Sequence, residues 1–384
     1  MRAPPRDTAQ VRIALVHELL TIPGGAEQVL RVLAAMFPDA PIYTLLYDER
    51  RLGQWFPRER VRTSSVQKLA RWNPMPSRYS HHWYLSRFPD AVEAWDVSEF
   101  DAVISSSSAF AHGILANGAP PHLCYVHSPA RYLWDRTHDV LERARSGPFG
   151  PARAWAAERL FHRLRRWDAE AGDRPERLLA ASQNVARRIE LYWRRRSDVL
   201  YPPLNDRWTR EALPERSGGD AYVIVSTLAA YKRVDLAIEA CKRLGRKLRI
   251  AGDGADYARL KALGGPGIEF LGHVPHDELP QLYTSAKATL FVGDEDFGLV
   301  PLESLACGTP VIAFRGGGAL EIVEEGVTGW FFDTPSPASL METITRAECA
   351  PHDAAACRTR AQRHDRSAFE AGIREHLHAL VKKA

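Results

Sequence analysis

The sequence lacks the features that mark membrane-spanning proteins, disulfide-stabilised scaffolds and zinc proteins. Its 384 residues include only five cysteines, and none stands in a Cys-x-x-Cys pair. An odd number of scattered cysteines argues against a disulfide framework and against a zinc site, and favours a reducing compartment. No apolar run approaches the roughly 20 residues that a helix needs to cross a bilayer.

A strong charge of one sign and a secretion signal are missing as well. The formal net charge of +4 is small for this length, which argues against a nucleic-acid partner. Met1–Gln10 is polar and proline-rich without an apolar centre, so we expect a disordered extension and not a signal peptide. We therefore expect a cytoplasmic protein in which a local basic patch could still meet anionic lipid or phosphate.

What the sequence has throughout is an alternation of short apolar strands and amphipathic helices. The alternation begins at Val11, pauses at Pro202-Pro203 and restarts at Tyr222. Adjacent prolines favour an extended crossing between domains, and the length suffices for two cores. We predict an α/β protein with two Rossmann-like, doubly wound parallel-sheet domains, residues 1–203 and 204–364, that face a central cleft.

An acidic loop between a strand and a helix is the central feature of the second half. The apolar run Ala288–Val292 predicts a buried strand, and a helix is predicted from Gly298 to about Cys307. Ligands of open α/β sheets bind at the carboxyl ends of the strands, and a helix start suits phosphate. Glu295 and Glu303 stand about two helical turns apart, so they can hold separate polyols of one extended ligand.

Two further loops join a strand end to residues that suit phosphate. Lys232 and Arg233 follow the strand Tyr222–Ser226 and are predicted to open the next helix. Fixed positive charge there would stabilise a departing diphosphate. Gly24 and Gly25 lie between the first strand and the first helix, where glycine lets a backbone approach a ligand closely. The alternatives are a solvated Lys-Arg pair and a plain strand-to-helix connection.

His127 ends a further predicted strand, Leu123–His127. A lone histidine is more often structural, but a position at the carboxyl end of a strand favours a functional role. The segment Glu49–Asp90 is rich in arginine and aromatic residues and is unlike a core strand. It is interpreted either as the frame of an acceptor site or as an irregular surface segment.

A metal site is the rival interpretation of the acidic loop. Asp294 and Asp296 form an Asp-x-Asp pattern, which can hold Mg²⁺ or Mn²⁺ at a nucleotide diphosphate. Because Lys232 and two helix starts would already neutralise the phosphates, we expect neither a metal ion nor another cofactor.

A long basic helix is predicted over Ala152–Ala171. Its predicted apolar side consists of Ala156, Leu160, Leu164, Trp167 and Ala171, and four arginines lie elsewhere around it. Such a helix can lie in a membrane interface, although it more often packs on its own domain.

Several motifs together resemble glycosyltransferase family 4, and the resemblance extends over nearly the whole chain. Its Glu-x7-Glu signature is similar to Glu295–Glu303, and the subgroup looks closest to bacterial polysaccharide mannosyltransferases. The other motifs that resemble the family are Gly24–Glu27, His127–Pro129, Tyr231–Ala240, Ala251–Gly254, Ala306–Ala313 and Gly316-Gly317.

This resemblance implies a GT-B fold and a retaining, metal-independent transfer from a nucleotide sugar held mostly by the second domain. The C-terminal helix, residues 365–384, would cross back to the first domain, and Ala152–Ala171 would contact the inner leaflet of the membrane. The resemblance implies donor contacts at Gly24, Gly25, Lys232, Arg233, Val274, Glu295, Phe297, Gly298, Leu299, Val300 and Glu303, and catalytic roles for His127, Glu295 and Lys232.

The family also implies a separate task for each group. Glu295 would bind the sugar hydroxyls, Glu303 the ribose, and Lys232 with the Gly298–Val300 backbone the diphosphate. His127 would lie beside the sugar. One departure is Thr227, because the family commonly carries arginine at this place; either one phosphate contact is lost or Arg233 supplies it.

The expected activity is transfer of a hexose to a lipid-linked or polysaccharide acceptor, with mannose from GDP-mannose favoured by the resemblance. The expected location is the cytoplasm, peripheral on the inner face of the plasma membrane. Three alternatives stay open: a UDP-sugar donor, a nucleotide-sugar 2-epimerase, and a non-catalytic nucleotide-sugar binding protein.

Overall fold

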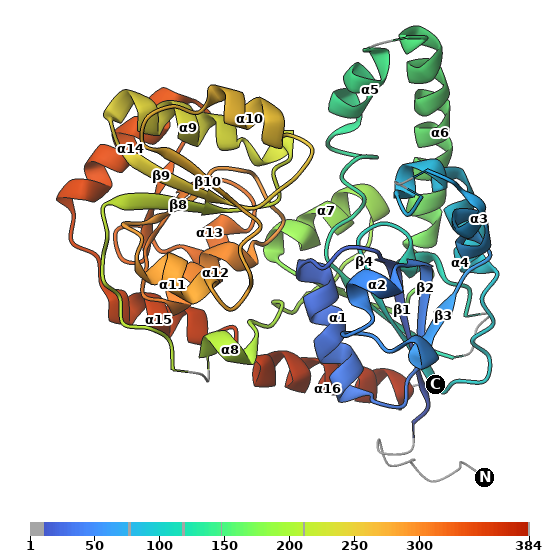
Figure 1. Ribbon diagram of the computed structural model, residues 1–384. Helices are drawn as coiled ribbons and strands as arrows, with labels where there is room; N and C mark the ends of the chain where they lie inside the picture. Colours follow the sequence, from blue (N-terminus) through green and yellow to red (C-terminus); the bar gives the residue numbers. More distant parts are fainter. Residues whose placement is uncertain (1–10, 76–77, 117–119, 147, 210–211, 383–384) are drawn as a thin grey trace. The chain divides into compact units, whose positions relative to one another are not determined.

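The computed structural model describes residues 11–75, 78–116, 120–146, 148–209 and 212–382. The N-terminal extension that the sequence predicts to be disordered lies outside these residues. The chain divides into two compact units, shown in Figure 1. Unit 1 comprises Met1–Pro202 and Ser367–Ala384, and unit 2 comprises Pro203–Arg366.

Unit 1 contains a seven-stranded sheet in the order β3-β2-β1-β4-β5-β6-β7, and all its pairs are parallel. The strands are β1 (Ile13–Leu20), β2 (Ile42–Tyr47), β3 (Val61–Thr63), β4 (Ala102–Ser107), β5 (His122–Val126), β6 (Arg177–Ala180) and β7 (Asp198–Val199). Strands β2, β4 and β5 are buried along their whole length. Such continuous burial is typical of parallel strands covered on both faces by helices.

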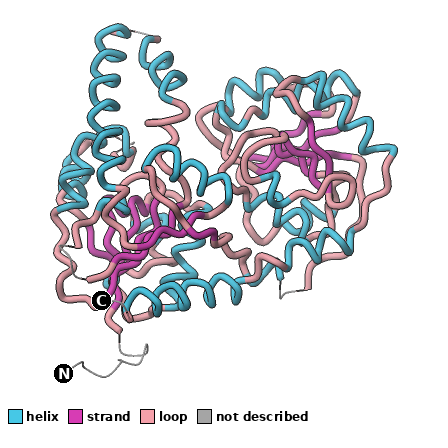
Figure 2. The backbone as a smooth tube through the Cα atoms, turned by 180° about the vertical axis from the view of Figure 1, so that it is seen from behind, coloured by secondary structure: helices cyan, strands magenta, loops and turns pink. Residues whose placement is uncertain are grey.

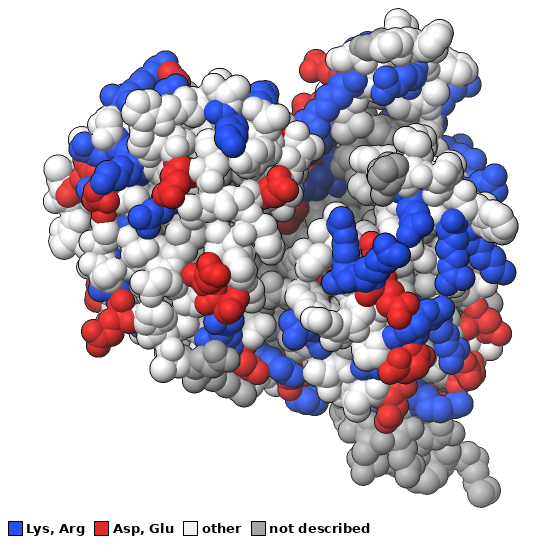
Figure 3. Space-filling model, in the orientation of Figure 1, with Lys and Arg blue, Asp and Glu red and all other residues white. Residues whose placement is uncertain are grey.

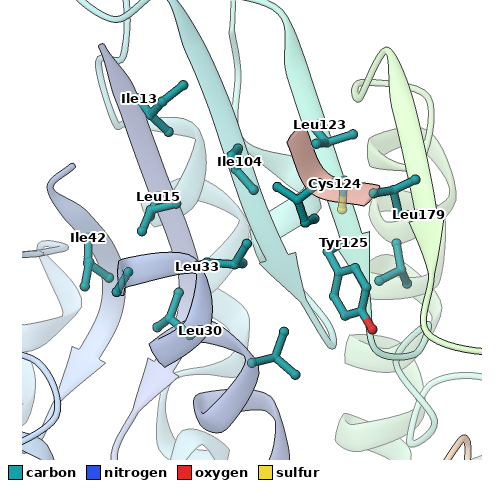
Figure 4. Packing of buried hydrophobic residues seen from close by; sticks show 14 of the residues in the cluster. Ile13, Leu15, Leu30, Leu33, Ile42, Ile104, Leu123, Cys124, Tyr125 and Leu179 are labelled. Carbon is teal, nitrogen blue, oxygen red and sulfur yellow. The ribbon is translucent and has the colours of Figure 1, made fainter. Parts of the chain in front are cut away.

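Helices cover both faces of the unit 1 sheet (Figure 2). They are α1 (Gly25–Met36), α2 (Glu49–Leu52), α3 (Val66–Trp72), α4 (Phe88–Glu93), α5 (Thr137–Arg145), α6 (Gly150–Ala171), α7 (Gln183–Trp193) and α16 (Arg366–Val381). One core packs α1, α7 and α16 against the sheet, and the other packs α3, α4, α5 and α6. Figure 4 shows side chains of this core, with Leu30 and Leu33 of α1 beside Leu15 of β1 and Ile42 of β2.

The C-terminal helix α16 belongs to unit 1 although it follows unit 2 in the sequence. Its side chains Phe369, Ile373 and Leu377 are buried in the first core, and the ring of Phe369 meets that of Tyr125 edge to face. Burial of side chains of this size stabilises unit 1 by roughly 1.5–3 kcal/mol each. The end of the chain is therefore part of the first core.

Helices α5 and α6 form a hairpin that stands away from the unit 1 sheet (Figures 1 and 2). The predicted apolar side of α6 is wrong in part, because Ala156 is exposed and Leu160 is only half-buried. The buried side of α6 consists of Ala154, Phe161, Leu164, Asp168 and Ala171, with Gly150 at the start of the helix. The helix therefore uses its C-terminal half to join the core.

Unit 2 contains a six-stranded parallel sheet in the order β10-β9-β8-β11-β12-β13. Its strands are β8 (Ala221–Val225), β9 (Lys247–Ala251), β10 (Ile268–Gly272), β11 (Thr289–Phe291), β12 (Val311–Phe314) and β13 (Gly329–Phe332). Its helices are α8 (Asp206–Thr209), α9 (Val234–Leu244), α10 (Tyr257–Leu263), α11 (Leu279–Thr284), α12 (Leu299–Ala306), α13 (Ala319–Ile322), α14 (Pro337–Cys349) and α15 (Ala354–Gln362). One core packs α9, α10 and α14 against this sheet.

Two sequence predictions need correction: the first strand, predicted over Val11–Val16 with His17 and Glu18 after it, and the segment Glu49–Asp90. Strand β1 continues to Leu20, so that His17 and Glu18 lie inside it and not in the following loop. The segment Glu49–Asp90 contributes strand β3 to the sheet, besides short helices. Strand β3 was missed because its three residues are too few to show an alternating pattern.

Candidate active site

The strand order of each sheet identifies where a ligand can bind. In unit 2 the order reverses between β8 and β11, and loops that follow the two strands at such a point leave in opposite directions. Lys232 lies in the loop after β8 and Glu295 in the loop after β11. Their side chains meet there, with 2.5 Å between Lys232 Nζ and Glu295 Oε1, and both are largely buried. The structure thus brings together two of the three predicted catalytic residues.

Lys232 ends a 3-10 turn, Ala230–Lys232, and does not open a helix as predicted. The helix α9 begins two residues later, at Val234, after Arg233, which adopts a left-handed conformation with φ of 52°. This conformation is uncommon for a residue with a side chain, and it separates the two basic groups. Lys232 turns toward Glu295, and Arg233 pairs with Asp235 at 3.4 Å.

The first turn of α12 presents backbone amides at the same edge of the sheet. Its N-cap is Gly298, with φ of 103° and no side chain that could accept from these amides. A side chain at this position would be strained and would meet the ring of Phe291 at 2.8 Å. Leu299 and Val300 therefore begin a helix whose positive dipole end is available to an anion. Phe297, just before it, is buried and supports the turn.

Glu303 lies on the buried side of α12, with only 5% of its surface exposed. Its Oε2 accepts a hydrogen bond of 3.0 Å from the hydroxyl of Tyr283 on α11. Burial raises the pKa of this carboxyl to about 7, although the Tyr283 hydroxyl opposes the shift. Glu303 is therefore a fixed hydrogen-bonding group whose orientation is set by Tyr283.

The acidic loop is held in shape by the glycines that precede α13. The amide of Gly318 donates to the carbonyl of Glu295 at 2.8 Å. A Cβ atom at Gly317 would lie 2.1 Å from the same carbonyl, and one at Gly318 would lie 2.2 Å from Phe297 Cα. Only glycine permits this approach, which fixes the backbone that carries Glu295.

Val274, which is predicted to contact the donor, lies away from the Lys232–Glu295 pair in the order of the sheet. It follows β10, which is two strands away from β8. The side chain is half-buried. Val274 is at the same carboxyl edge as Lys232, but the sheet does not bring the two residues together.

In unit 1 the strand order reverses between β1 and β4, and a hydrogen-bonded cluster lies there. His127, just after β5, shares a hydrogen bond of 2.8 Å with Ser106 Oγ. The same hydroxyl lies 3.1 Å from His17 Nδ1, and His17 Nε2 lies 3.4 Å from Glu27 Oε1 on α1. The cluster connects His127 with the glycine loop, because a Cβ atom at Gly24 would lie 2.7 Å from Glu27 Oε2.

The pKa values of the two histidines in this cluster are shifted in opposite directions. Burial, assisted by the neighbouring His17, lowers the pKa of His127 to about 3. Burial also acts to lower the pKa of His17, but Glu27 and Glu18 outweigh it and raise that pKa. His127 is therefore neutral at physiological pH and takes part in hydrogen bonds through its ring nitrogens.

Glu18 fills a ring of amide donors in unit 1, a role that the sequence analysis missed. Its Oε1 accepts from the amide of Ala109 at 2.6 Å, from that of Phe110 at 3.1 Å, and from the amide of Ser108. The Ser107 hydroxyl adds a further donor at 3.1 Å. Burial opposes ionisation of Glu18, but the charge of His17 and these amides lower its pKa. The sequence signal for this ring is an acidic residue, Glu18, at the end of one predicted strand and a run of serines, Ser105–Ser108, at the end of another.

A second buried carboxyl, Asp168 of α6, is joined to this ring through His112. Ser107 Oγ lies 3.0 Å from His112 Nδ1, and His112 Nε2 lies 3.5 Å from Asp168 Oδ1. The indole N–H groups of Trp134 and Trp193 donate to Asp168 Oδ2 at 2.8 and 2.7 Å. Burial raises the pKa of Asp168 to about 7 in spite of these donors.

Among the described residues, no three or more histidine, cysteine, aspartate or glutamate side chains form a group that could hold a metal ion. The part of the chain that the structure describes also contains no helix that is long and apolar enough to cross a membrane.

The comparisons with known proteins concern the family and the fold of the chain. The family model for glycosyl transferases group 1 matches residues 206–364, nearly the whole of unit 2. An uncharacterised glycosyltransferase, MJ1178 of Methanocaldococcus jannaschii, is 27% identical over 174 residues, 44% of this chain and 48% of that protein. A D-inositol 3-phosphate glycosyltransferase of Frankia alni is 31% identical over 185 residues, 41% of this chain and 46% of that protein. The chain spans about half the length of these two relatives.

Solved structures resemble the chain over its whole length. HepE of Anabaena, in complex with UDP and glucose, has a TM-score of 0.68 at 18% identity and covers 96% of this chain and 99% of its own. Sucrose-phosphate synthase of Thermosynechococcus elongatus has a TM-score of 0.69 at 16% identity and covers 97% and 100%. These likenesses confirm the predicted α/β class with two Rossmann-like units of the GT-B type. The matches support the group 1 glycosyl transferase family.

Proposed function

We propose that the protein is a retaining glycosyltransferase that moves a hexose from a nucleotide sugar to a lipid-linked or polysaccharide acceptor. The observation that carries this proposal is the contact between Lys232 and Glu295 beside the uncapped start of α12. A cation, a helix start and a carboxylate at one strand edge provide separate groups for a diphosphate and a sugar.

Unit 2 binds the donor in this proposal. Lys232, Arg233 and the amides of Leu299 and Val300 hold the diphosphate, and Lys232 releases Glu295 to bind the sugar hydroxyls. Glu303, oriented by Tyr283, binds the ribose. Gly24 and Gly25 of unit 1 allow a close backbone approach to the donor. Phe297 and Val274 are the remaining proposed donor contacts.

The proposed route leaves the configuration of the sugar unchanged without a covalent intermediate. Lys232 and the start of α12 stabilise the charge that builds on the leaving diphosphate. A phosphate oxygen of that diphosphate takes the proton of the acceptor hydroxyl, which attacks from the same face. The transition state has oxocarbenium character, as in other glycosyl chemistry. His127, kept neutral by burial, hydrogen-bonds the transferred sugar.

GDP-mannose is the donor that we favour, from the resemblance to bacterial mannosyltransferases. A UDP-sugar is the second candidate, because HepE was solved with UDP and with UDP-glucose. The test is nucleotide release by the purified protein with GDP-mannose, UDP-glucose and other nucleotide sugars, with and without a lipid-linked acceptor. Acceptor-dependent release of one nucleotide supports transfer and identifies the base. Isomerisation without release would indicate an epimerase, and binding without turnover a non-catalytic protein.

The α5–α6 hairpin is the proposed contact with the inner face of the membrane. Phe149, in the connection between the helices, is 84% exposed, and Trp155 of α6 is 59% exposed. The guanidinium of Arg159 lies 4.5 Å from the Trp155 ring centre, and Lys and Arg side chains gather along the hairpin (Figure 3). Exposed aromatic and basic side chains together favour an anionic bilayer surface. Flotation with anionic and neutral vesicles tests this contact.

A further inference from the structure

Unit 1 contains a pocket of about 360 Å³ that the proposed donor site does not use. It opens where β2 and β3 end, at the carboxyl edge of the sheet. Its lining residues are Tyr47, Asp48, Glu49, Arg50, Arg58, Thr63, Gln67, Arg71, Arg78 and Tyr79. Four of the ten are arginines, and two are acidic.

Basic groups outnumber acidic groups in this pocket, with four arginines against Asp48 and Glu49. In the described part of the chain, no carboxylate lies within ion-pair distance of the guanidinium groups of Arg50, Arg71 or Arg78. Arg58 donates to the carbonyl of Val61 at 2.6 Å, which fixes it without cancelling its charge. The Asp48 carboxylate accepts from the Arg50 amide at 3.2 Å as the cap of α2. Lys and Arg side chains gather over α2 and α3 in Figure 3.

A hollow in unit 2 provides the contrast. It measures about 340 Å³ and lies at the amino ends of β8, β9 and β10, the edge opposite the donor site. Its basic residues have partners: Lys247 pairs with Asp220 at 2.7 Å, and Arg249 pairs with Glu269 at 3.4 Å. Charges in the unit 2 hollow are therefore balanced within the protein, whereas those in the unit 1 pocket call for an anion from outside.

The wall of the unit 1 pocket is rigidly built. The side-chain amide of Gln67 bonds to both backbone groups of Tyr47, at 2.9 and 3.0 Å, and so attaches α3 to the end of β2. The Tyr47 hydroxyl donates to the carbonyl of Phe56 at 2.7 Å. Gln67 and Tyr47 are both buried. These bonds fix the backbone that carries Arg71, which follows Gln67 by one helical turn.

The pocket adjoins the loop that carries Gly24 and Gly25. Tyr47 is paired with Leu20 in the parallel register of β1 and β2, and the Asp48 amide donates to the Leu20 carbonyl at 2.8 Å. The loop toward the two glycines leaves β1 at this point. A ligand in the pocket would therefore extend along the same edge of the sheet toward the residues of unit 1 that the proposed function uses.

We infer that this arginine pocket binds a phosphate group of the acceptor, so that the preferred acceptors are phosphorylated. Guanidinium groups match the geometry of phosphate and form charge-assisted hydrogen bonds with it. That the bound molecule is an acceptor rests on the proposed function. The binding of phosphate itself can be measured without turnover. The phosphate can belong to a soluble sugar phosphate or to a lipid headgroup.

The test measures phosphate binding directly, in the full-length protein. Binding of glycerol 3-phosphate is followed by calorimetry, and binding to phosphatidylcholine vesicles that contain phosphatidic acid by flotation. Both use the Lys232→Ala background, which removes the cation of the donor site. Vesicles with phosphatidylserine control for charge without a phosphate monoester. The variants are Arg71→Gln with Arg78→Gln, and the matched control is Lys68→Gln, which removes an exposed charge of α3 outside the pocket.

We expect the double variant to weaken phosphate binding by about tenfold or more, and Lys68→Gln to leave it unchanged. Arg71→Lys should restore part of the affinity. Binding of glycerol 3-phosphate indicates a soluble source, and binding only to phosphatidic acid vesicles indicates a headgroup. No binding of either probe, or equal binding by the double variant, would overturn the inference. Absence of acceptor-dependent nucleotide release from the parent protein, which keeps Lys232, together with intact phosphate binding would instead refute the proposed transfer.

Discussion

The two units share a strand order, but their points of reversal are built differently. In unit 1 the amides after β4 converge on Glu18, which belongs to the neighbouring strand β1. In unit 2 the corresponding helix start, at Gly298, has no side-chain cap hydrogen bond, and Lys232 pairs with Glu295 in the loop that precedes it. The same topology thus produces a ring of donors that is satisfied internally and another that is suited to an external anion.

This difference explains why the donor diphosphate is assigned to unit 2. Any anion at the unit 1 ring would have to displace a buried carboxylate that is held by several hydrogen bonds and by the charge of His17. At unit 2 the competing group is Glu295, which is paired with Lys232 by one contact and is more exposed than Glu18. Displacing one partly exposed ion pair costs far less than emptying a buried ring of donors.

The largest expected effect comes from removing either member of the Lys232–Glu295 pair in unit 2. Lys232→Ala and Glu295→Ala should each lower acceptor-dependent nucleotide release by about 10²–10³ or more, because each group is proposed to act on the reacting diphosphate or sugar. The matched control is Lys242→Ala, which removes an exposed lysine of the following helix α9. Circular dichroism and thermal unfolding should be close to those of the parent. Full activity in either site variant would reject the assignment.

A second variant tests whether Glu18 satisfies the ring of amide donors in unit 1. Glu18→Ala leaves the amides of Ala109 and Phe110 and the Ser107 hydroxyl without their acceptor, so unfolding should become easier by about 3–5 kcal/mol. Sulfate should stabilise this variant more than the parent, because the ring can then take an external anion. Denaturant unfolding with and without sulfate measures both effects, with the exposed Glu99→Ala as control. An unchanged midpoint would show that Glu18 does not satisfy these donors.

A smaller effect concerns pH and the second buried carboxyl of unit 1. The folded-state pKa of Asp168, about 7, is raised above its ordinary value, so the folded protein retains a proton that the unfolded chain releases. Its contribution to stability is therefore full below about pH 4 and is lost as the pH rises toward 7, at about 1 kcal/mol per pH unit.

Asp168→Asn removes this titration and can keep both indole hydrogen bonds. The measurement is the difference in unfolding free energy between parent and variant at several pH values. Between pH 5 and pH 7.5 the parent should lose unfolding free energy relative to the variant. A difference that stays constant with pH would contradict the raised pKa.

The sequence predicted unit 2 better than unit 1 for a physical reason. The loops that carry Lys232 and Glu295 are close in sequence to the strands and helices that position them, and Gly293 and Gly298 mark the loop of Glu295. Local patterns therefore predicted the α12 start within one residue. The Glu18 ring instead joins groups about 90 positions apart in the chain, and no local pattern relates a glutamate to amides at that separation.

Similar limits apply to the edges of elements and to helix faces. Lys232 was expected to open a helix because a helical pattern follows it, but the left-handed Arg233 lies between them and α9 begins two residues later, at Val234. On α6 the periodicity placed Ala156 on the buried side, whereas tertiary packing buries Asp168 with two indole donors. A buried aspartate cannot be predicted from hydrophobic periodicity, because its partners come from other segments.

The smallest expected effect is that of chelation, and it tests the remaining use of the acidic loop. Glu295 already has the Lys232 ammonium at 2.5 Å, and the Glu295 carbonyl accepts from Gly318. A divalent ion at this loop would have to compete with that ammonium for the carboxylate, and Lys232 with the start of α12 already supplies positive charge to a diphosphate. We therefore expect EDTA to leave acceptor-dependent nucleotide release unchanged. If EDTA abolishes release and Mn²⁺ restores it, Asp294 and Asp296 are metal ligands, and the balance of charge proposed for unit 2 is wrong.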